Sequence, residues 1–183
     1  MAFFAVNSVD GQITSSIEED ESNYTRIVGG FVPKFGQFPF MASIWENRQV
    51  RPFCGGSIIG YRHILTAAHC LEGKQQIARN CYVIVGGYDI NFQYPGEQQI
   101  QVCKFIIHEH YSNNVARTND VALVRLCSSV KFGPTVKNIR LIVEDYQLYP
   151  PQKFLIAGWG TKQHETDYFS SILLGVVVDF VPF

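Results

Sequence analysis

Two short segments of this 183-residue chain contain residue types that transfer protons. Leu-Thr-Ala-Ala-His-Cys at 65–70 carries His69, and Asn-Asp-Val-Ala-Leu at 119–123 carries Asp120. An imidazole titrates near neutral pH, so a histidine can take up a proton as a general base and return it as a general acid. Considered singly, both residues have ordinary alternatives. His69 could be a packed or surface histidine, and Asp120 a carboxylate in a turn or at a strand start.

The cysteines and the other histidines give less support to metal chemistry. None of the five cysteines forms a Cys-x-x-Cys pair, so the usual zinc and thioredoxin spacings are absent. The odd count leaves at least one cysteine without a partner in this chain. His108 and His110 would share one face of a strand, which metal binding permits.

The composition indicates a globular protein, with 46% hydrophobic and 17% charged residues. The length suggests one domain, or two small halves that share one chain. The net charge of -1 does not favour nucleic acid or an anionic membrane as a partner. No apolar stretch reaches 18 residues, so we expect no transmembrane helix.

The predicted elements are mostly strands, because short apolar and β-branched runs alternate with Gly, Pro and Asn. Only Ala67–Leu71 favours a short helical turn. The pattern predicts an all-β sandwich or barrel. The predicted strands are Phe40–Trp45, Gly56–Ile59, His63–Thr66, Tyr82–Val85, Gln99–Ile107, Val121–Leu126, Phe154–Ala157 and Ile172–Val178.

Two of the cysteines lie in neighbouring predicted strands. If Cys81–Ile90 and Gln98–Ile107 pair as a hairpin centred near Phe92, Cys81 falls opposite Cys103. That register would allow a disulfide between them. The alternative is two independently buried thiols.

The first 26 residues differ from the rest of the chain. They hold five acidic residues and one basic residue, a net charge of -4, whereas residues 27–183 hold 14 basic and 11 acidic residues, a net charge of +3. We interpret 1–26 as a disordered leader or pro-segment; the alternative is a solvated tail without a role. The apolar run Met1–Val6 is short for a secretory signal, which is therefore not evident. Asn23 begins an N-glycosylation sequon.

Four segments resemble the chymotrypsin/trypsin-like serine proteases (peptidase S1) in type, order and approximate spacing. They are Arg-Ile-Val-Gly-Gly at 26–30, the two segments that carry His69 and Asp120, and Ala-Gly-Trp-Gly at 157–160. Cys-Gly-Gly-Ser at 54–57 also fits. The resemblance runs from Ile27 to about Val178. It implies an all-β, trypsin-like double β-barrel, with the first barrel complete over 27–130 and the second incomplete over 131–183.

The same resemblance implies a role for each matching residue. His69 would be the general base and acid of a Ser-His-Asp triad, and Asp120 would hold its imidazole in the required tautomer. Cys54 and Cys70 would form a disulfide that ties the histidine segment to the neighbouring strand. An activating protease would cut the zymogen after Arg26 and expose the ammonium group of Ile27. The substrates would be proteins or peptides, and the protein would be secreted.

The resemblance also bears on the remaining metal-ligating residue types. The segment 106–111, which contains His108 and His110, resembles the family's strand-to-loop stretch before the aspartate, so we expect no metal site and no cofactor. Cys127 has no partner that the family suggests. A buried or free thiol is its simplest interpretation.

One part of the triad has no counterpart in residues 1–183. The family's nucleophile lies in a Gly-Asp-Ser-Gly-Gly segment well after Gly-Trp-Gly, and only 23 residues follow Gly160. Ser170 and Ser171 lack a tight glycine turn that would expose a hydroxyl. Ser57 lacks the second glycine of a Gly-x-Ser-x-Gly elbow. We therefore expect the 183-residue chain to be inactive alone.

Three interpretations follow. The chain is a C-terminally truncated serine endopeptidase, a non-catalytic protease homologue that binds or regulates a partner, or a β-barrel binding module unrelated to proteases. The third treats four ordered motifs as coincidence. The first is favoured because His69 and Asp120 are both present.

Overall fold

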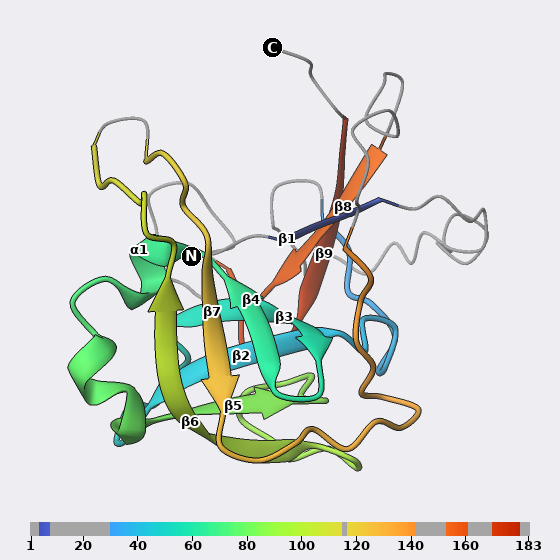
Figure 1. The fold of residues 1–183 in the computed structure, drawn as a ribbon. Helices are drawn as coiled ribbons and strands as arrows, with labels where there is room; N and C mark the ends of the chain where they lie inside the picture. Colours follow the sequence, from blue (N-terminus) through green and yellow to red (C-terminus); the bar gives the residue numbers. More distant parts are fainter. Residues whose placement is uncertain (1–3, 8–29, 115–116, 142–152, 161–169, 180–183) are drawn as a thin grey trace. The chain divides into compact units, whose positions relative to one another are not determined.

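The structure, a computed structural model, describes residues 4–7, 30–114, 117–141, 153–160 and 170–179. The described chain forms two compact units. Lys34–Leu141 make up the first unit, and the second draws on Phe4–Pro33 and Ile142–Phe183. Figure 1 labels the strands and the short helix of both units.

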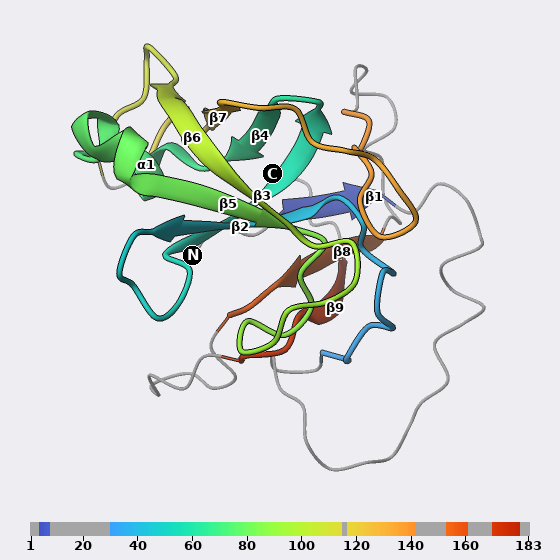
Figure 2. The same ribbon diagram turned by 90° about the horizontal axis from the view of Figure 1, so that it is seen from below.

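Six antiparallel strands of the first unit close into a barrel in the order β2-β3-β4-β7-β6-β5 (Figure 1). Pairing of β5 with β2 completes the ring, and these two strands lie side by side in Figure 2. Closure leaves the barrel without a free sheet edge. The strands are β2 (Met41–Glu46), β3 (Cys54–Gly60), β4 (His63–Thr66), β5 (Cys81–Val85), β6 (Gln98–Ile107) and β7 (Ala122–Leu126).

Alternation of side chains along the strands produces the barrel core. In β7, Ala122, Val124 and Leu126 are buried, whereas Arg125 faces solvent. This period of two is the sequence pattern that predicts strands. The core includes fully buried side chains from all six strands: Ile44, Ile58, Ile64, Val83, Val102, Val124 and Leu126.

The second unit contains a three-stranded sheet in the order β1-β8-β9. Here β8 (Lys153–Gly158) pairs with β9 (Leu174–Asp179) on one edge and with β1 (Phe4–Asn7) on the other. A closed barrel and a partial second sheet confirm the predicted fold class. The strand β1 differs from the expectation of a disordered leader. Phe4–Asn7 pair with the second edge of β8 and so provide hydrogen-bond partners for backbone groups that the strand would otherwise leave unpaired.

The boundary between the units also differs from the predicted one. Residues 131–141 belong to the first unit, because Lys137 donates its backbone N–H to Pro39 and Ile139 donates its own to Ile58, at 2.8 Å each. Phe31 belongs to the second unit, where it exchanges two backbone hydrogen bonds with Gly175.

Gly56 in β3 is a position where the barrel tolerates no side chain. A Cβ there would lie 2.5 Å from Cγ2 of Ile64 and 2.9 Å from the carbonyl oxygen of Leu65. We therefore expect Gly56→Ala to lower the free energy of unfolding by about 1–3 kcal/mol, the usual cost of overpacking. Denaturant unfolding would measure it. Gly60→Ala is the control, since nothing lies within 4 Å of a Cβ at Gly60. An equal loss in both variants would contradict the steric explanation.

Candidate active site

His69 lies on the short helix α1 (Ala68–Leu71), which begins two residues after β4. A helix of one turn is not stable by itself, so tertiary contacts must hold it. Ala68 and Leu71 are fully buried, and a disulfide joins Cys70 to Cys54 on β3, with 6.1 Å between their Cα atoms. The helix, and His69 with it, is therefore fixed to the barrel wall.

Asp120 lies in a tight turn just before β7. Asn119 adopts the left-handed conformation (φ 54°), which asparagine tolerates better than most residues. The backbone N–H of Val121 donates to the carbonyl of Asn119 at 2.7 Å and closes a three-residue turn centred on Asp120. The Asn119 side chain donates to the carbonyl of His110 at 2.9 Å. These bonds set the direction of the Asp120 side chain.

The barrel register brings the two residues together across 51 positions of sequence. Thr66, the last residue of β4, pairs with Ala122, the first residue of β7. His69 follows the first strand and Asp120 precedes the second, so both lie at the same end of this strand pair.

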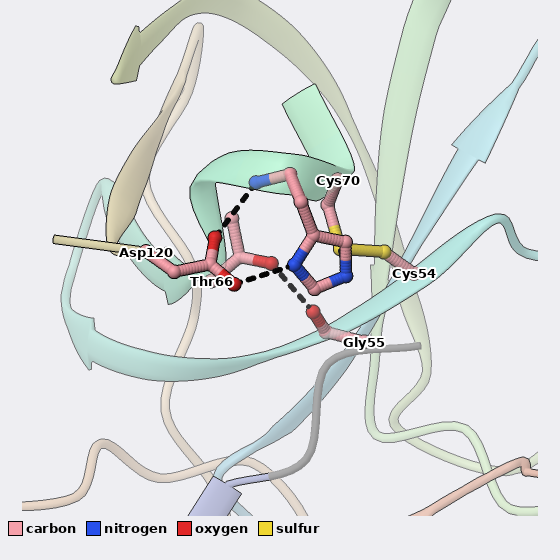
Figure 3. Close-up of a disulfide and its surroundings, with 6 residues drawn as sticks. Cys54, Gly55, Thr66, Cys70 and Asp120 are labelled. Carbon is pink, nitrogen blue, oxygen red and sulfur yellow. Dashed lines mark hydrogen bonds and ion pairs between the residues drawn. A yellow bond between two sulfur atoms is a disulfide. The ribbon is translucent and has the colours of Figure 1, made fainter. Parts of the chain in front are cut away.

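The carboxylate of Asp120 accepts two hydrogen bonds from His69 (Figure 3). Its Oδ2 lies 2.7 Å from the ring Nδ1, and its Oδ1 lies 2.8 Å from the backbone nitrogen. The side chains of His69 and Asp120 are 21% and 24% exposed, so the pair is only partly shielded from water. Two bonds to one residue fix both the position and the plane of the imidazole.

This geometry determines where the imidazole carries its proton. An ionised carboxylate only accepts hydrogen bonds, so Nδ1 must carry the hydrogen that Asp120 receives. In the neutral ring the lone pair then lies on Nε2. Nε2 lies 3.7 Å from Sγ of Cys70, a weak contact because that sulfur is part of a disulfide. The arrangement can act as a general base through Nε2.

Electrostatics keep Asp120 ionised. Burial raises the pKa of Asp120, but the hydrogen bonds from the backbone and ring of His69, together with the positive charges of His69 and Arg117, hold that pKa below its ordinary value. The sequence motifs assign no role to Arg117. Its place three residues before Asp120 is the only signal that could have suggested one.

The lowered pKa predicts a loss of stability in acid. The folded state favours the ionised form, so the stabilisation is fully present above the unfolded pKa of about 3.9 and is lost as the pH falls through the lower folded value. We expect the unfolding free energy to decline below about pH 4, and to decline less in Asp120→Asn. Denaturant unfolding between neutral pH and strongly acidic pH would measure both. Parallel curves for the two proteins would contradict the prediction.

Thr66 supports the site without having been singled out in the sequence. Its hydroxyl is almost fully buried and donates to the carbonyl of Gly55 at 2.8 Å. Figure 3 shows this bond beside Asp120 and the Cys54–Cys70 disulfide. It links the end of β4 to β3 directly before α1 begins.

The structure corrects one predicted cysteine pairing. The Cys81–Cys103 disulfide that the predicted hairpin would allow is not formed: Cys103 joins Cys127, with 4.9 Å between their Cα atoms, and of the two thiols in the alternative only Cys81 is free and buried. The hairpin register pairs Tyr82 with Gln101, one position away from the register that would place Cys81 opposite Cys103. The interpretation of Cys127 as a buried or free thiol is wrong as well. Burial raises the pKa of the Cys81 thiol.

The observed disulfides leave Cys81 as the single free thiol of the five cysteines. When the chain is denatured without a reductant and alkylated, we expect modification at Cys81 alone, because only a free thiol can be alkylated. Peptide mass spectrometry would locate the label. After reduction, all five cysteines should be modified. Labelling of Cys103 or Cys127 before reduction would contradict the assignment.

Two residue groups of the described chain resemble metal ligands, and in each of them some of the donor atoms are already engaged. Donor atoms of Cys54, His69 and Cys70 lie within 4.8 Å of one another, but the two sulfur atoms form a disulfide. Nδ1 of His108 lies 3.1 Å from the backbone nitrogen of His110, which donates to it.

The remaining predicted site residues are placed as follows. Asn23, Arg26 and Ile27 lie outside the described residues. Ser170 is 1% exposed, and its hydroxyl makes no hydrogen bond among the described residues. Ser171 is half-buried. Among the described residues, no helix is long and apolar enough to cross a membrane.

The chain is similar in sequence to a known protein family and to individual proteins. A family model described as Trypsin matches residues 27–182. The chain is 39% identical over 160 residues to Hypodermin-B of Hypoderma lineatum, covering 85% of this chain and 57% of that protein. It is 36% identical over 160 residues to Trypsin delta of Drosophila erecta, covering 85% of this chain and 58% of that protein.

A solved structure shows a similar fold. Neuropsin, a serine protease expressed in the limbic system of mouse brain, superimposes with a TM-score of 0.71 at 30% identity. The match covers 82% of this chain and 63% of neuropsin. The chain thus spans less than two thirds of the length of each of these relatives.

Proposed function

Because the chain belongs to the trypsin family of serine proteases, we propose that it supplies the histidine and aspartate of a serine endopeptidase active site. The observation that carries this proposal is the bond of 2.7 Å between Nδ1 of His69 and Oδ2 of Asp120, in a segment that matches the family. The substrates in this proposal are proteins or peptides.

His69 acts in two directions in the proposed reaction. Its Nε2 takes the proton from the nucleophilic serine hydroxyl as that oxygen attacks the peptide carbonyl, and then gives the proton to the departing amine. Asp120 remains ionised and stabilises the imidazolium that forms between these steps. Its lowered pKa suits that role, since the carboxylate stays charged at any pH where His69 is an effective base.

The nucleophilic serine is proposed to come from outside residues 1–183. Ser170 and Ser171 have the surroundings of packed residues, and Ser57 is 3% exposed within β3. The chain by itself is therefore proposed to be inactive. The alternative is a non-catalytic homologue that binds or regulates a partner. Labelling of a serine-completed chimera distinguishes it from the proposed peptidase.

The proposal also includes activation of a zymogen by cleavage and an extracellular location of the protein. Cleavage after Arg26 by an activating protease would release the leader and expose Ile27, as the Arg-Ile-Val-Gly-Gly segment suggests. Two disulfides are suited to an oxidising, extracellular compartment, and Asn23 offers a glycosylation site there.

The experiment completes the chain with a serine. Residues 27–178 would be joined to the Gly-Asp-Ser-Gly-Gly-bearing segment of a complete family member, and the chimera treated with a fluorophosphonate probe. We expect covalent labelling that His69→Ala abolishes, because the serine needs a base to become nucleophilic. His63→Ala is the control, an exposed histidine on β4 that should leave labelling intact. A folded chimera that is not labelled, or is labelled equally without His69, would favour the non-catalytic alternative.

A further inference from the structure

A cluster of basic side chains lies on the outside of the barrel, at the ends of β4 and β7 opposite to the His69–Asp120 pair. All of its members are exposed to solvent. We call this cluster the basic patch, and it consists of Arg62, His63, Arg79, Lys104 and Arg125.

The barrel register places three of these residues in one row. Arg125 on β7 pairs with His63 on β4 and with Lys104 on β6. Residues that pair directly across antiparallel strands point to the same face, and neighbouring strands lie about 4.8 Å apart. The row therefore crosses three adjacent strands, which Figure 1 shows side by side.

Two arginines extend the row around the end of β7. The guanidinium of Arg62 donates to the carbonyl oxygens of Leu126 and Cys127. Nη1 of Arg79, on the 3₁₀-helix η2 (Gln75–Asn80), lies 4.0 Å from Sγ of Cys127. Because Cys127 is two residues beyond Arg125, both arginines join the same charged surface.

The charge of the basic patch is not neutralised within the described residues. None of its four arginine and lysine side chains makes an ion pair there, whereas Lys74 pairs with Glu46 and Lys153 with Asp179. Like charges directly opposite each other destabilise a sheet. An anionic partner would remove that repulsion.

We propose that the basic patch binds a sulfated polysaccharide. A row of basic side chains across a strand surface suits an extended chain of repeated anionic groups, and arginine binds tetrahedral oxyanions through two parallel hydrogen bonds. The net charge of -1 and the pI of about 6.5 are unlike those of a nucleic-acid-binding domain. The choice of an extracellular glycan rests on the location proposed above. The patch itself does not depend on that location.

Heparin is the probe, and the complete 183-residue chain is the protein. We expect binding by titration calorimetry at low ionic strength that weakens as added salt screens the surface charges. Lys104→Glu with Arg125→Glu should weaken binding at least about tenfold. Lys34→Glu with Lys137→Glu is the matched control, because it changes the net charge equally at exposed lysines outside the patch. The control should retain affinity within about twofold.

A single variant separates binding from folding. Lys104→Glu places a carboxylate opposite Arg125 on the neighbouring strand and should form a favourable cross-strand pair. We therefore expect a melting temperature equal to or above that of the parent, together with weaker heparin binding. A loss of affinity in a more stable protein cannot come from unfolding.

Several results would overturn the proposal. These are an equal loss of affinity in both double variants, equal binding of desulfated heparin, and equal affinity for a DNA duplex. Tighter binding of a peptide of residues 14–26, which contains the acidic run at 18–21, would instead assign the patch to the chain's own leader. None of these measurements needs peptidase activity, so their failure is distinguishable from failure of the proposed function.

Discussion

Residues 27–183, obtained by cleavage after Arg26, are expected to hydrolyse peptides at least about 10⁶-fold more slowly than a complete relative. Loss of a triad nucleophile alone costs about that factor in kcat. The residual activity that such enzymes keep depends on the oxyanion hole and substrate binding. By resemblance to the family, both belong to segments outside these residues, so no compensation is expected.

Fluorogenic peptide turnover and fluorophosphonate labelling would measure this prediction, with Trypsin delta as the reference protein. The His69→Ala form of the same chain is the control, since any turnover that survives this substitution comes from contamination. Stoichiometric labelling of Ser170, Ser171 or any other serine in residues 27–183 would contradict the prediction. It would also locate a nucleophile that the motifs do not reveal.

The barrel strands could be predicted from sequence because each buries one face. The run predicted for β4, His63–Thr66, has the same bounds in the structure. The predicted bounds of β6 differ by a single residue, owing to the clear alternation of Gln-Ile-Gln-Val. The 3₁₀-helix η2 could not be predicted in this way. It has no side-chain N-cap and buries only Ala78, so neither capping nor periodicity marks it.

The disulfide pairing could not be predicted from local sequence pattern. The sequence predicts the pairing of β5 with β6 but places its register one residue away from the register in the structure. The loop between the strands does not determine that register, and a shift of one position moves a side chain to the other face. A bulge between Val102 and Lys104 then alters the position of Cys103 on β6. Its partner, Cys127, follows the neighbouring strand.

The candidate site depends partly on features that the sequence reveals and partly on contacts that only the tertiary structure creates. His69 and Asp120 could be named only because their segments resemble a family, since no periodicity links residues 51 positions apart. Their contact depends on the pairing of β4 with β7, which is a long-range property of the closed barrel. Arg117 and Thr66 act through that same tertiary arrangement and could not be assigned from sequence.

Asp120→Asn is expected to move the proton of His69 from Nδ1 to Nε2. The native carboxylate accepts from two donors, the ring Nδ1–H and the backbone N–H of His69. An asparagine offers one accepting oxygen and one donating NH₂ group. The backbone N–H cannot change its role, so the oxygen is expected to remain there and the NH₂ group to face the ring. Nδ1 must then accept, which places the ring hydrogen on Nε2.

This change of tautomer removes the lone pair that the proposed reaction needs. With Nε2 protonated, the neutral imidazole cannot take the proton of the serine, although its position is almost unchanged. In the serine-completed chimera we expect kcat to fall about 10⁴-fold, the loss that this substitution causes in a Ser-His-Asp triad. The imidazole ¹⁵N chemical shifts of the 183-residue chain would report the tautomer directly, so the prediction does not depend on whether the chimera folds.

Asp89→Asn provides the matched control for this substitution. Asp89 is more buried than Asp120, and its Oδ1 accepts a hydrogen bond from the backbone N–H of Asn91 at 2.9 Å, which an asparagine oxygen can keep. We therefore expect the His69 spectrum of this variant to match that of the parent. Persistence of the Nδ1–H tautomer in Asp120→Asn would mean that the carboxylate does not select it. Asp120 would then have to act through its charge, and the expected loss of kcat would no longer follow from the geometry.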